Sequence, residues 1–155
     1  MPAPDLETIY DFEGNIEPGL VTLLTALSLS AYTQREVSQI VTPYVMVQLA
    51  VGASTEHYAA FAGDYRPDVW NSTLQIQVVT SRANTNLSHT AYRAKVRKAL
   101  AVDADYKNST TFPYHEIFSV LESGTTPSIL TEDNLDVSSL AYSLKFGIRS
   151  GAWPV

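Results

Sequence analysis

The strongest pattern in the sequence is an alternation of apolar and polar positions near the C-terminal end. Every second position there is apolar, in the order Leu140, Tyr142, Leu144, Phe146 and Ile148. Such alternation places one row of side chains on a single face of a β-strand. It predicts a strand at 137–149, and the same period predicts strands at 43–52, 69–81 and 114–122.

The predicted strand at 114–122 differs from the others because both of its faces carry apolar residues. Ile117 and Leu121 lie on one face, and Phe118 and Val120 lie on the other. This pattern fits a central strand, or a strand that a partner covers.

Two segments instead follow the spacing of three and four residues that marks a helix with one buried face. Proline is tolerated in a first helical turn, so Pro18 and the leucines after it predict a helix at 18–30. A second helix is predicted at 87–101, with Asn86 or Ser88 as its cap. The fold class is therefore a single α+β domain. We expect a mixed or antiparallel four-stranded sheet with two helices on one face, in the order α-β-β-α-β-β.

Residues 1–17 differ in composition from the rest of the chain. They carry five acidic side chains without a basic one, together with Pro2, Pro4 and Gly14. We predict an extended N-terminal arm at 1–17, followed by one domain at 18–155. The arm is either a solvated terminus or a segment that orders on a neighbouring subunit, with Tyr10 and Phe12 as apolar anchors.

The overall composition narrows the class of function. The net charge of −6 argues against a protein whose main function is to bind nucleic acid, since such binding needs basic residues. The absence of cysteine excludes disulfides and thiolate chemistry. No signal peptide or long apolar run is found, which predicts a soluble product with no membrane partner.

The sequence offers little catalytic chemistry. His57, His89 and His115 fall in three different predicted elements, and we interpret them as surface or turn residues. The cluster Glu132, Asp133 and Asp136 lacks the spacing of a calcium loop. We therefore predict no catalytic residue, no cofactor and no metal, and an enzyme is the weaker alternative.

Candidate interface residues come from aromatic and basic segments. A connection at 52–68 is long for a compact domain and rich in aromatic residues, which indicates a docking element. Arginines on the helix at 87–101 lie either on a solvated face or at a contact with an acidic neighbour. The candidates are Tyr10, Phe12, Tyr58, Phe61, Tyr65, Trp70, Arg93, Arg97 and Trp153. For the two tryptophans, core packing is the default interpretation and an interface anchor is the alternative.

The order of elements resembles that of the tail terminator, or tail completion, proteins of long-tailed bacteriophages. The similar segments are Leu74–Ser81, the polar loop after it, the helix from Ser88 and the strand Leu140–Arg149. The likeness covers residues 16–149 and consists of the order of elements and the spacing of hydrophobic residues.

This resemblance implies a structural virion protein, made in the host cytoplasm, at the head-proximal end of the tail. Its copies would form a hexameric ring that caps the tail tube and contacts a neck or head-completion protein, while DNA passes without specific binding. A neck or head-completion subunit, or a tail tube subunit, is the alternative. Two substantial helices count against the β-sandwich of a tube subunit.

Overall fold

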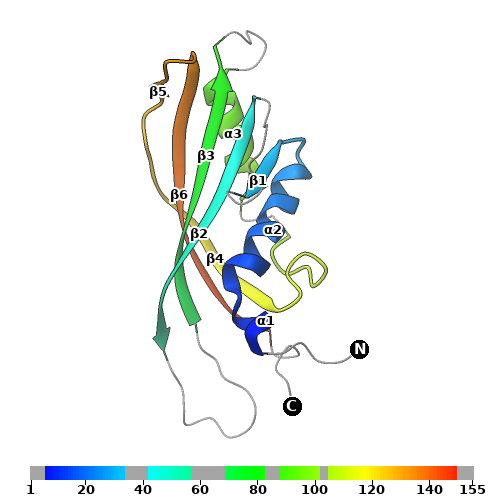
Figure 1. Ribbon diagram of the computed structural model, residues 1–155. Coiled ribbons are helices and arrows are strands. Elements are labelled where there is room, and N and C mark those ends of the chain that lie inside the picture. The colour runs from blue at the N-terminus through cyan, green and yellow to red at the C-terminus, as the bar shows by residue number, and fades with distance from the viewer. Residues whose placement is uncertain (1–5, 34–41, 57–68, 83–87, 102–104, 150–155) are drawn as a thin grey trace, which may run out of the picture.

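The computed structural model describes residues 6–33, 42–56, 69–82, 88–101 and 105–149. These residues form one six-stranded sheet with helices packed on it (Figure 1). The helices are α1 (Leu6–Tyr10), α2 (Phe12–Thr25) and α3 (His89–Ala99). The strands are β1 (Ala31–Thr33), β2 (Tyr44–Glu56), β3 (Val69–Ser81), β4 (His115–Thr125), β5 (Ile129–Leu130) and β6 (Leu135–Ile148).

The sheet has the order β1-β2-β3-β6-β4, and β5 also pairs with β6. β1 runs parallel to β2 and all other pairs are antiparallel, so the sheet is mixed. The α+β class and the four long strands are confirmed, but the prediction of four strands is wrong. The added strands β1 and β5 have three and two residues, which is too short to leave a periodic pattern.

One face of the sheet carries the core. Paired residues Val47, Ile76 and Leu140 form a buried row across three strands. The buried face of α2, with Leu20 and Leu24, packs in the same cluster. The other face carries mainly polar side chains, among them Gln48, Gln75 and Gln77, and stays open to solvent among the described residues. Alternation along each strand thus separates a helix-covered face from a polar face.

The expected extended arm at 1–17 is corrected for residues 6–17, which form α1 and the first half of α2. Asp11 caps α2, because its Oδ1 accepts a hydrogen bond from the Gly14 amide at 3.2 Å. Pro18 therefore lies inside the helix and does not start it. A proline there costs about 3 kcal/mol. Burial of Phe12 and of Ile16 stabilises the fold by about 2 to 3 kcal/mol each, and this outweighs the cost of the proline.

Candidate subunit-interaction surface

Large apolar side chains gather on one edge of the sheet. In the described part of the chain, four of the six exposed large hydrophobic residues lie on β4 and β5. Their exposed fractions are 53% for Phe118, 64% for Leu121, 67% for Ile129 and 46% for Leu130. Both strands pair with β6 alone among the described residues, so their other side is open. We call this surface the β4–β5 edge.

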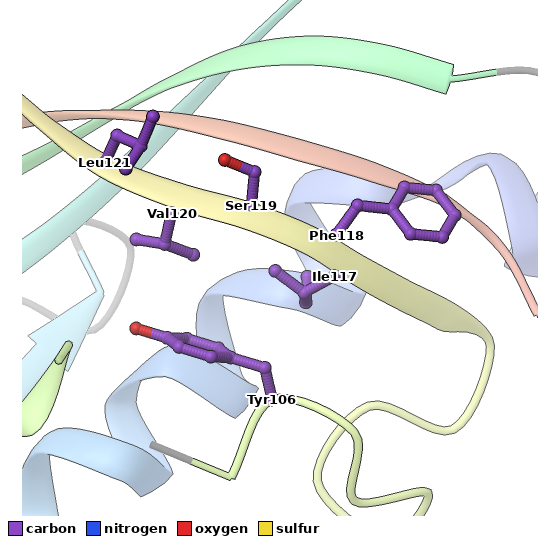
Figure 2. A pocket seen from close by; sticks show the side chains of 6 residues that line it. All are labelled: Tyr106, Ile117, Phe118, Ser119, Val120 and Leu121. Atoms are coloured by element: carbon purple, nitrogen blue, oxygen red, sulfur yellow. The ribbon is translucent and has the colours of Figure 1, made fainter. Parts of the chain in front are cut away.

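A groove of about 230 Å³ runs along β4 on the helix side of this edge (Figure 2). Ile117 and Val120 point toward the ring of Tyr106, whose hydroxyl donates to the Leu100 carbonyl at 2.8 Å. The open strand edge therefore lies beside an apolar groove. The groove is lined by Tyr106, Ile117, Phe118, Ser119, Val120 and Leu121.

A β-bulge changes which apolar residues of β4 share a face. The pairing of β4 with β6 shifts between Ile117 and Ser119, so Phe118 is the extra residue of the strand. A bulged residue is released from the regular alternation of faces. The extra residue places Ile117 and Val120 on the face of Tyr106 and leaves Phe118 and Leu121 on the other face (Figure 2). The predicted grouping of Ile117 with Leu121, and of Phe118 with Val120, is therefore wrong.

The opposite edge of the sheet is partly closed. β1 pairs with β2 only at Val45–Val47. Beyond it, the buried carboxylate of Glu17 accepts a hydrogen bond from the Leu49 amide at 3.0 Å. Glu17 thereby occupies an edge amide that could otherwise form a hydrogen bond with a strand of another chain. The sheet thus has one edge that is protected along the first half of β2, from Val45 to Leu49, and an open β4–β5 edge.

Three of the candidate interface residues come together near the start of β3. The ring of Phe12 lies 4.9 Å from that of Trp70 and 5.0 Å from that of Phe146. Tyr10 lies 6.4 Å from Trp70 and is 41% exposed. Phe12 is buried, and Trp70 is half-buried with its ring stacked on Phe146. Phe12 is therefore a core residue, and Tyr10 has the most surface of the three to offer a partner.

The two arginines of α3 have different environments. Arg97 Nη2 lies 2.9 Å from the Glu122 carboxylate, and this hydrogen bond raises the pKa of Arg97 above its usual value. Arg97 thus ties α3 to β4. Arg93 is half-buried, and its Nε has no hydrogen-bond partner among the described residues. Like Arg97, Lys95 and Lys98 are exposed, so Arg93 is the one arginine or lysine of this helix that is half-buried.

The remaining candidates, Tyr58, Phe61, Tyr65 and Trp153, lie outside the described residues. The exposed β4–β5 edge was absent from the candidate set. Its signal in the sequence was the apolar character of both faces of 114–122, which fits a strand covered by a partner. The sequence left the choice between that reading and a central strand open, and the structure places β4 at an edge.

His115 is not a surface residue, which corrects its interpretation, whereas His89 is partly exposed. His115 is buried, and its Nε2–H donates to the Ile9 carbonyl at 2.9 Å. Half-buried His89 joins α3 to two strands, with Nδ1 2.8 Å from Thr80 Oγ1 and Nε2 2.6 Å from Ser138 Oγ. Each ring thus forms hydrogen bonds with residues of other elements. Local sequence does not reveal such contacts. His57 lies outside the described residues.

We expect His115 to destabilise the fold in acid. Burial lowers the pKa of His115 to about 4, below its usual value of 6.5. The ring is neutral in the fold but protonates in the unfolded chain, so stability falls from pH 6.5 down to about pH 4. The full loss is about 3 kcal/mol. Urea unfolding should show this loss in the wild type and a smaller one in His115→Gln. Equal pH dependence in both proteins would contradict the assignment.

Within the described residues, no three His, Cys, Asp or Glu side chains are grouped so that they could hold a metal ion. The helices of the same part of the chain are too short or too polar to cross a membrane.

The comparisons with known proteins show the fold. No protein-family model matches the sequence, and no curated protein matches it significantly. A chain from a structure described as the virion of a native gene transfer agent particle is similar in fold. That likeness covers 88% of this chain and 98% of the other, with a TM-score of 0.56 and 16% identity. A second solved protein, whose description states no function, is similar over 98% of this chain and 100% of its own. Its TM-score is 0.54 at 13% identity.

Proposed function

We propose that this protein is a structural subunit of a phage-type virion. Within that class it is a tail terminator whose copies form a hexameric ring on the head-proximal end of the tail tube. The ring joins the tube to a neck or head-completion protein, and its role is assembly and not catalysis. DNA passes the ring without being specifically bound.

The observation that carries this proposal is the fold likeness to a chain of a gene transfer agent virion. The likeness spans nearly all of both chains, so it concerns whole subunits and not a shared fragment. Its identity of 16% makes it a likeness of fold. The role is inferred from that likeness together with the element order that resembles tail terminators.

The exposed β4–β5 edge supports an assembling protein. Phe118 and Leu121 on β4, and Ile129 and Leu130 on β5, expose apolar side chains on two strands whose outer side is unpaired among the described residues. An edge of this kind pairs readily with other chains, and monomeric proteins usually protect it. A subunit that is covered on assembly has no need of such protection.

The arrangement of the sheet favours the terminator over a tube subunit. The described strands form one sheet, and its apolar face is covered by helices. A tube subunit of the β-sandwich type would cover that face with a second sheet. Contacts with the tube and the neck are assigned to Tyr10, Trp153 and three aromatic residues of the predicted connection, namely Tyr58, Phe61 and Tyr65. The first residues of that connection, 52–56, belong to β2.

Native mass spectrometry and negative-stain electron microscopy of the full chain test this function. We expect a closed ring with a mass about six times the 17.0 kDa of one chain. When mixed with isolated tail tubes, the ring should bind at one end only and stop their further growth. A protein that stays monomeric at high concentration, or a ring that coats tubes along their length, would contradict the proposal.

A further inference from the structure

We propose that β4 of one copy pairs with the outer edge of β2 of the next, so that the sheet continues from subunit to subunit. This inference rests on the proposed ring, and it names the seam between the copies. The occupant of the β4 part of the β4–β5 edge is therefore the segment Ala50–Glu56 of a second copy.

The first argument is that both edges are open at the same level of the sheet. Ala50 pairs with Thr73, Thr73 with Ser143, and Ser143 with Leu121. These residues therefore form one row across all four long strands. The exposed Leu121 on β4 thus lies level with Ala50, next to the part of β2 that extends past β1.

The protected first half of β2, from Val45 to Leu49, marks where the seam ends. β1 covers Val45–Val47, and Glu17 occupies the Leu49 amide. From Val51 to Glu56, β2 pairs with β3 alone among the described residues. Trp70 pairs with both Ser54 and Phe146, and Phe146 pairs with Ile117. The unprotected part of β2 is hence level with the part of β4 that includes Phe118.

Strand direction is the second argument. β2, β3, β6 and β4 are each antiparallel to the next, so β2 and β4 run in opposite directions. Copies placed side by side in the same orientation then bring β4 beside β2 as an antiparallel pair. A ring needs this head-to-tail relation, in which two different surfaces meet and no copy is inverted. Equal levels also allow the ring to close without a rise from copy to copy.

The third argument is the apolar surface that the added strand would cover. A strand beside β4 removes Leu121 and Phe118 from water and closes the open side of the 230 Å³ groove. Backbone hydrogen bonds would supply affinity, and the groove would select the side chains. The incoming segment includes Val51-Gly52-Ala53-Ser54, whose small residues allow close approach.

Cysteine cross-linking tests the seam, and the chain has no cysteine to interfere. The variants are Ala50→Cys and Leu121→Cys, both at exposed positions of the same row. Within one copy these sites are three strand spacings apart, roughly 14 Å, which is too far for a disulfide. Across the proposed seam, paired Cα atoms lie about 4.5 to 5.5 Å apart, within disulfide reach.

We expect an equal mixture of the two single variants to form covalent dimers on mild oxidation, whereas each variant alone forms none. The double variant should give a ladder that ends at the mass of the closed ring. Gln48→Cys is the matched control, because Gln48 is an exposed β2 residue two positions out of the row. Its yield with Leu121→Cys should be roughly tenfold lower, since diagonal neighbours lie about 7 Å apart.

The outcomes separate this seam from the proposed function. A ring without the 50–121 disulfide overturns the seam and leaves the ring standing. Dimers of Leu121→Cys alone would show a two-fold β4 contact and overturn the head-to-tail pairing. Equal yields for Gln48→Cys and Ala50→Cys would overturn the register. A protein with neither ring nor cross-link overturns both proposals.

Discussion

Leu121→Lys is expected to weaken self-association of the protein strongly while leaving each copy folded. Leu121 is 64% exposed, so its replacement should change the free energy of unfolding by less than about 0.5 kcal/mol. A lysine on an edge strand opposes pairing, because its charge would have to leave water. We expect the association constant to fall by about two orders of magnitude or more, as measured by analytical ultracentrifugation.

Leu27→Lys is the matched control for this change. Leu27 is also an exposed apolar residue, at 36%, but it follows α2 and lies away from β4. Its replacement should leave both the melting temperature and the association constant close to those of the wild type. If the two lysine variants assemble equally well, the β4–β5 edge is not an interface.

Phe12→Ala should cost far more stability than Tyr10→Ala, although both residues were interface candidates. Phe12 is buried against Trp70, Phe146 and His115, with ring centroids 4.9 to 5.4 Å away. Removing such a side chain from a core costs about 3 to 5 kcal/mol. Tyr10 is 41% exposed, so its loss should cost about 1 kcal/mol or less.

Urea unfolding of both variants measures the difference between them. A Phe12→Ala protein as stable as the wild type but unable to assemble would restore Phe12 as an interface anchor. A Tyr10→Ala protein that loses more than about 3 kcal/mol would show that Tyr10 belongs to the core.

The strands could be predicted from the sequence because burial on one face forces strict alternation. The strand at 69–81 was predicted with the bounds that the structure shows. The start of α2 was placed wrongly because Pro18 is a strong local signal, whereas the burial of Ile9 and Ile16 against β-strands is a tertiary effect. β1 exists only through its three pairs with β2, which no local pattern encodes.

The candidate surface was harder to predict than the fold. The sequence identified aromatic residues but could not tell that Phe12 faces the core and Tyr10 the solvent. It indicated that 114–122 is apolar on both faces, yet edge and centre positions give the same pattern. Only the strand order, with β6 between β3 and β4, leaves β4 at the edge. The ion pair of Arg97 with Glu122 is likewise a long-range contact.

The position of β6 has a consequence for the timing of folding during synthesis. Among the described strands β6 comes last in the chain, but it lies between β3 and β4 in the sheet. Until Leu135–Ile148 has left the ribosome, β4 has no strand to pair with and the core row has a gap. Arg149, just after β6, then fixes the loop that precedes β4, because its Nη2 donates to the Phe112 carbonyl at 3.0 Å. The open edge is therefore created only once β6 is available, so nascent chains that still lack β6 do not present it to one another.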